Sequence, residues 1–161
     1  MDIGELGGMV QAELEAEGLW DPAYATTRRD WYLATLALIR DRFHTLKDFT
    51  TAGRAYFADT YAIDPKPLAK NVLKFPELAD WLPQLAERFA ALAEFTAETT
   101  EQASREMADE LGVKPGVLIN GMRTVLTGQL AGPSMFEVLT TLGREKVVAR
   151  LAHVDHLFIP A

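Results

Sequence analysis

The chain is 161 residues long, which suits one domain or two small helical subdomains. Hydrophobic residues make up 48 % and charged residues 24 %, as in ordinary soluble proteins, and no apolar run approaches the roughly 18–20 residues that span a bilayer. The lack of cysteine excludes disulfides, thiolate zinc sites and thiol catalysis, and the acidic N-terminus does not resemble a signal peptide, so we expect a cytoplasmic protein.

The net charge of −7 taken alone argues against nucleic-acid binding, because phosphate attracts Lys and Arg. The charges are unevenly distributed, however. Residues 111–136 contain no acidic side chain, and residues 28–54 contain six basic side chains against three acidic ones. Any single cluster of this kind is also compatible with a solvated helix face.

Helical signals begin at the N-terminus. Apolar residues recur at helical spacing over residues 3–14, and Gly18 can end that helix in the left-handed conformation. Two further helix starts carry capping side chains, namely Asp30 ahead of residues 31–39 and the capping-box pair Thr45 and Asp48.

Proline and glycine mark the elements that follow. Asp64 and Pro65 fit an N-cap and a first helical residue, and Pro76 is predicted to open a helix that Pro83 should bend or divide. Four later helices are predicted: one after Thr96 that stops at Gly112, one from Pro115 to near Gly128, a short one from Pro133 to Gly143, and a last one starting at Glu145.

Strand-type alternation is nearly absent, so the predicted fold class is all-α. We expect two small helical-bundle subdomains packed in tandem. The boundary is placed near Ala93, just ahead of a new helix cap, which gives subdomains of residues 1–93 and 94–161.

Motifs for catalysis are missing. The sequence has no glycine-rich phosphate loop and no nucleophile elbow, and its acidic pairs, such as Glu13 and Glu17, lie on acidic faces without a pocket. His153 and His156 share one helical face, but a metal needs more ligands than two. We therefore predict no catalytic residue, no metal and no cofactor in this chain.

Residues 111–151 carry the most specific pattern. They contain Gly-Val-Lys-Pro-Gly (112–116), Arg-Thr-Val-Leu-Thr-Gly (123–128), Gly-Pro-Ser-Met-Phe-Glu (132–137) and Leu-Gly-Arg-Glu (142–145). This series resembles the C-terminal anticodon-binding region of bacterial glutamyl-tRNA synthetases. Upstream, residues 42–48 resemble the Arg-x-x-Thr-Leu-Lys-Glu segment of the same family. Asn120-Gly121 and Ser134-Met135 depart from the common family residues at their positions.

The resemblance implies the helical anticodon-binding cage of a class I glutamate–tRNA ligase. The catalytic motifs of that family do not occur here, so ATP, Mg²⁺ and the ligase reaction would belong to a catalytic domain of the parent protein. The implied partners are the anticodon loop of tRNA-Glu and that catalytic domain, in a monomer that does not bind membranes. A stand-alone helical adaptor for proteins or tRNA is the alternative function, and a fragment that binds nothing measurably is another.

The implied anticodon-binding residues are Arg42, Arg123, Pro133, Ser134, Met135 and Phe136. In the family, an Arg at the position of Arg42 reads the third anticodon base and separates glutamate tRNAs from glutamine tRNAs. Physical chemistry adds support, because a helix opening at Pro133 leaves free N–H donors, and Met135 and Phe136 could contact unstacked bases. The alternatives are that Phe136 is a core residue, that Arg123 forms a surface ion pair, and that Arg42 caps its own helix or pairs with Asp48.

Overall fold

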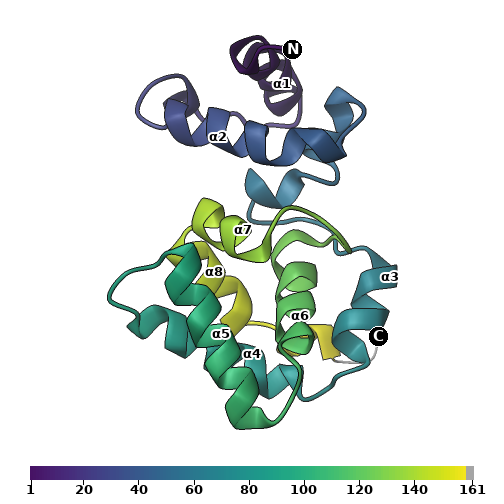
Figure 1. Ribbon diagram of the computed structural model, residues 1–161. Helices are drawn as coiled ribbons and strands as arrows, with labels where there is room; N and C mark the ends of the chain where they lie inside the picture. The colour runs from purple at the N-terminus through teal and green to yellow at the C-terminus, as the bar shows by residue number, and fades with distance from the viewer. Residues whose placement is uncertain (159–161) are drawn as a thin grey trace. The chain divides into compact units, whose positions relative to one another are not determined.

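The computed structural model describes residues 1–158, and every regular element in that range is helical, which confirms the predicted all-α fold (Figure 1). The chain forms two compact units, Met1–Tyr61 and the remainder from Ala62 onward. The boundary predicted after residue 93 lies inside the second unit instead. The physical reason is that α4 (Leu78–Ala91), which precedes that point, packs along α8 (Arg144–Ala152) and against α5 (Ala97–Leu111).

The first unit has two α-helices, α1 (Ile3–Ala16) and α2 (Arg29–Ile39). Gly18 follows α1 with φ 72°, as predicted. Asp30 does not cap α2, because Arg28 occupies the N-cap and Asp30 lies in the first turn, where the helix dipole favours a negative charge. The unit also contains four 3₁₀ turns: η1 (Pro22–Ala25), η2 (Arg40–Arg42), η3 (Leu46–Thr50) and η4 (Arg54–Tyr56).

Tyr32 lies at the centre of the first unit. Its side chain is fully buried, and its hydroxyl donates a 2.6 Å hydrogen bond to the Gly7 carbonyl of α1. Aromatic rings from other segments surround it: Trp20, Tyr24 and Phe57. Burial of these rings holds α1 and α2 together, because large aromatic side chains contribute much of the apolar area of a small core.

The second unit begins with a short helix, α3 (Pro65–Pro67), capped by Asp64 as predicted. It continues as a turn of π-helix, η5 (Leu68–Leu73), and then as α4. Pro83 lies inside α4 and does not divide it, although it removes one N–H from the helical ladder. The helix keeps its apolar face in the core through Leu78, Leu82, Leu85 and Phe89.

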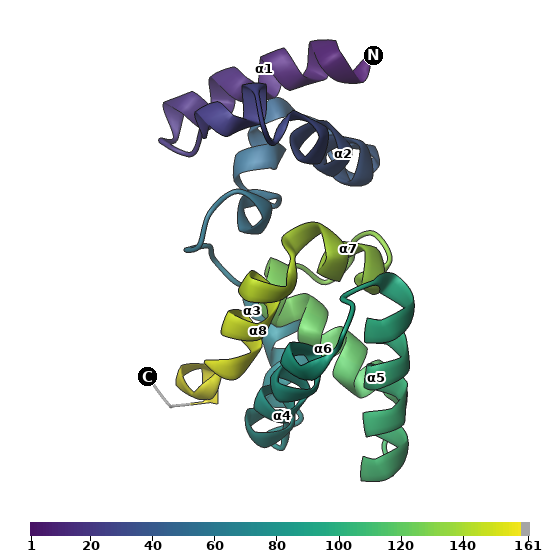
Figure 2. The same ribbon diagram turned by 90° about the vertical axis from the view of Figure 1, so that its left-hand side faces the viewer.

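Up to residue 158, four more α-helices follow in this unit: α5, α6 (Pro115–Thr127), α7 (Met135–Leu142) and α8, and then the 3₁₀ turn η6 (Asp155–Phe158) (Figure 2). Gly112 and Gly128 end α5 and α6 with φ 70° and 75°, as predicted. The Gly128 carbonyl accepts the Asp64 N–H at 2.9 Å, so the end of α6 is tied to the start of the unit. None of the helices in residues 1–158 is long and apolar enough to cross a membrane.

Candidate nucleic-acid interface

Arg42 lies in the 3₁₀ turn η2 at the end of α2, and its side chain is exposed. The residues that follow are fixed. The Phe43 ring packs edge-on against Phe49, with 4.9 Å between the ring centroids. The same ring lies so close to Gly53 that a Cβ added there would come within 2.9 Å of it. Arg42 is thus an exposed residue next to a packed aromatic ring.

Asp48 does not pair with Arg42. Its carboxylate accepts the backbone N–H groups of His44 and Thr45 at 2.8 and 3.0 Å, which completes the predicted capping box, although the helix it caps is the 3₁₀ turn η3. These backbone hydrogen bonds lower the pKa of the Asp48 carboxyl group. Among residues 1–158, the Arg42 guanidinium has no ion pair or hydrogen bond, so neither structural alternative for this side chain is observed.

Arg123, on α6, is half-buried. Its guanidinium donates a 2.8 Å hydrogen bond to the Pro133 carbonyl in the loop that leads into α7. A Cβ on Gly132 would lie 2.9 Å from the same guanidinium, so the glycine allows the side chain to lie flat against the loop. The structure therefore brings two of the sequence-predicted site residues together. This hydrogen bond is to a backbone carbonyl.

The helix predicted to open at Pro133 begins two residues later. Ser134 is the N-cap of α7, and its exposed hydroxyl makes no capping hydrogen bond. Within the part of the chain that the structure describes, the N–H groups of Ser134, Met135 and Phe136 have no acceptor, as expected for a first turn. The donor set predicted from the sequence is thus present at this end of the helix.

Met135 and Phe136 do not provide the open apolar surface that the sequence suggested. Their side chains are only 2 % and 8 % exposed, because the eight-residue helix α7 turns its apolar face toward α5 and α8. Both are core residues in this conformation, which agrees with the alternative stated above for Phe136, and their contact with unstacked bases stays a prediction.

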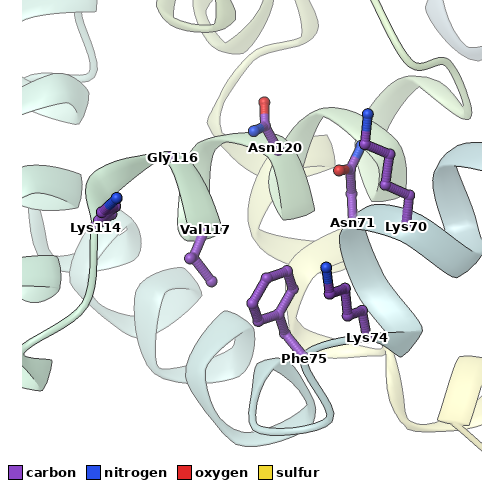
Figure 3. A pocket seen from close by; sticks show the side chains of 8 residues that line it. All are labelled: Lys70, Asn71, Lys74, Phe75, Lys114, Gly116, Val117 and Asn120. Atoms are coloured by element: carbon purple, nitrogen blue, oxygen red, sulfur yellow. The ribbon is translucent and has the colours of Figure 1, made fainter.

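A pocket of about 300 Å³ lies between η5 and α6, and sequence reasoning did not identify it (Figure 3). Its side chains include three lysines: Lys70, Lys74 and Lys114. Lys114 belongs to the acid-free stretch noted above, and the spacing of four between Lys70 and Lys74 places both on one helical face. These two signals were in the sequence, but only folding brings the segments together.

Residues 1–158 contain no group of three or more His, Asp or Glu side chains arranged to hold a metal ion. His153 and His156 are exposed at the end of the described chain.

Comparison with known proteins gives a consistent result. The profile of the family described as "Anticodon binding domain" matches residues 8–155. The chain is 64 % identical over 158 residues to the glutamate–tRNA ligase of Desulfotalea psychrophila and 45 % identical over 149 residues to glutamate–tRNA ligase 2 of Koribacter versatilis. These alignments cover 98 % and 92 % of this chain but 32 % and 30 % of the relatives.

A solved structure shows the same fold. A glutamate–tRNA ligase from Elizabethkingia meningosepticum, crystallised in complex with its amino acid, aligns with a TM-score of 0.75 at 22 % identity, over 94 % of this chain and 28 % of that one. The chain thus spans about a third of the length of the relatives it matches. With residues 8–155 matched by one profile, this all-helical chain belongs to the anticodon binding domain family and is homologous to part of the glutamate–tRNA ligases.

Proposed function

We propose that this chain recognises the anticodon loop of tRNA-Glu, as the C-terminal part of a glutamate–tRNA ligase. The observation that carries the proposal is the family match over residues 8–155. It is supported by the exposed Arg42 on its fixed turn and by the free N–H donors at the start of α7. Both features are of the kind that contacts phosphates and splayed bases in single-stranded RNA loops.

In this proposal the ligase reaction takes place elsewhere in the parent protein. A catalytic domain would bind ATP and Mg²⁺ and join glutamate to the tRNA, and this chain would orient the tRNA toward it. The parent would be a cytoplasmic monomer. The chain alone should show no glutamate-dependent ATP–pyrophosphate exchange in the presence of tRNA.

Arg42 is the proposed selector for the third anticodon base. Arginine has only donors, and both cytosine and guanine offer acceptors, so discrimination must come from the shape of the site and not from hydrogen-bonding type alone. An exposed side chain held on a rigid turn fits this role, because its reach is fixed by the backbone.

The proposal is tested by titrating the 161-residue chain with tRNA-Glu and with its anticodon stem-loop over a range of salt concentrations. The expected result is binding that weakens steeply as salt rises, because counterions are released when Lys and Arg contact phosphates. Binding that is independent of salt, or equal for an unrelated stem-loop, would favour the alternative of a protein-interaction adaptor, which the pI of about 5.0 supports.

A further inference from the structure

The pocket between η5 and α6 combines three kinds of lining. Phe75 and Val117 form an apolar wall, Asn71 and Asn120 contribute amides, and the lysines 70, 74 and 114 contribute ammonium groups. Figure 3 shows the Phe75 ring pointing into the space between the two helices, with Val117 on one side and Lys74 on the other. Among the described residues, the lining has no acidic side chain, although the whole chain carries 23 of them.

The lysines of the pocket have no carboxylate partner in the part of the chain that the structure describes. All three are exposed, and their ammonium groups form no ion pair within 4.0 Å in residues 1–158, where other cations such as Arg105 and Arg88 have carboxylate partners. Lys114 is also the N-cap of α6, whose first turn contains no acidic residue. The positive end of the helix dipole therefore adds to the lysine charges and favours an anion in this pocket.

The backbone on one side of the pocket is unusual. Lys70 and Asn71 are carried by η5, the π-helical turn, a conformation that is rare and often found at functional sites. Asn71 is 9 % exposed, and its side-chain amide donates to the Thr124 hydroxyl of α6 at 3.4 Å, so this wall is fixed to the helix across from it. The pocket is a formed feature of the second unit and not a gap between loosely placed side chains.

We propose that this pocket binds a nucleotide, with its phosphate on the lysines and its base against Phe75 and Val117. A volume of about 300 Å³ suits a group of the size of one base better than a larger ligand. An aromatic ring beside cationic and amide groups is the combination that binds unstacked bases and their phosphates in single-stranded RNA. This inference rests on the proposed function for the source of the nucleotide, which would be an unpaired residue of the bound tRNA.

The first arm of the test uses RNA. The variant Lys74→Gln/Lys114→Gln is compared with Lys66→Gln/Arg105→Gln, which removes two exposed cations outside the pocket. The pocket variant should bind tRNA-Glu more weakly, and its plot of log affinity against log salt should be shallower by about 0.7 for each lost single-strand phosphate contact. Phe75→Leu, which keeps an apolar wall without the stacking ring, should bind about fivefold more weakly or worse.

The second arm uses free ligands. The unmodified chain is titrated with uridine and adenosine monophosphates and with inorganic phosphate, and NMR shifts of the Phe75 ring and the Val117 methyl groups are followed. Shifts with nucleotides but not with phosphate are expected, because only a base reaches the apolar wall. If phosphate shifts the lysine signals and no nucleotide shifts the Phe75 ring signals, nucleotide binding is contradicted.

The two arms separate failure of this inference from failure of the proposed function. If tRNA binds but the pocket and control variants lose the same affinity, and nucleotides leave Phe75 unchanged, the pocket is not a nucleotide site. If tRNA does not bind at all, the proposed function fails, and the nucleotide shifts alone decide whether the pocket binds a free nucleotide. Weakened RNA binding confined to the pocket variants identifies the tRNA as the source.

Discussion

Arg42 and Arg123 both belong to segments that resemble one enzyme family, yet the structure uses them differently. Arg42 is exposed on a 3₁₀ turn of the first unit and makes no side-chain bond within residues 1–158. Arg123 is half-buried in the second unit and holds the Pro133 carbonyl. The difference teaches that two arginines in segments resembling the same family can have different environments. One is exposed and unbonded within the described residues, and the other supports the backbone of a loop.

The largest expected effect on stability is at Phe136, which lies in the second unit together with Arg123. Phe136→Ala should lower the free energy of unfolding by about 3–5 kcal/mol, because it leaves a cavity under α7. Urea unfolding measures this, and Phe136→Leu serves as the control that keeps most of the volume. If Phe136→Ala is nearly as stable as the parent but loses RNA binding, the ring faces the RNA and the buried conformation is not the functional one.

Arg123→Ala should have the next largest effect, about 1–2 kcal/mol of unfolding free energy. The variant loses the hydrogen bond from the charged Arg123 guanidinium to the Pro133 carbonyl. The contribution of this bond to stability is reduced because the side chain is half-exposed. RNA binding should weaken together with stability, since the start of α7 loses its support. Unchanged stability with weakened RNA binding would show that Arg123 acts on the RNA directly, as Arg42 is proposed to do.

Arg42→Gln should change the unfolding free energy by less than about 0.5 kcal/mol, because the side chain is exposed and makes no bond within the described residues. Its effect should appear in specificity. The parent chain should prefer a stem-loop with cytosine over guanine at the third anticodon position, and the variant should lose that preference. Equal binding of both stem-loops by the parent, or full discrimination by the variant, would remove Arg42 as the selector.

The smallest effect is expected at Asp48, which fixes the turn after Arg42. Its folded pKa is lowered by the N–H groups of His44 and Thr45, so its stabilising contribution is present above the unfolded pKa of about 3.9 and is lost as pH falls through the folded value. Unfolding curves from about pH 6 to about pH 3 should therefore depend less on pH for Asp48→Asn than for the parent. Identical pH profiles would mean that the capping box does not hold this turn in solution.

The sequence by itself determined the helical class and most helix ends. Gly18, Gly112 and Gly128 end helices where predicted, and Asp64 and Thr96 cap the starts of α3 and α5. Both effects are local, because capping and left-handed glycine depend on neighbouring residues in the chain. The family resemblance also rested on sequence alone, because it depends on which residues occur and on their spacing along the chain, and not on the surroundings of each side chain.

Only the tertiary structure decided which faces are buried and which segments meet. The packing of α4 on α8 places α4 in the second unit, so the units divide after residue 61 and not near residue 93. The burial of Met135 and Phe136 follows from the contacts of α7 with α5 and α8. The lysine pocket joins residues 70–75 with residues 114–120, which are far apart in sequence. Such contacts depend on the whole arrangement of helices, because the free energy of burial is set by the partners that folding supplies and not by local propensity.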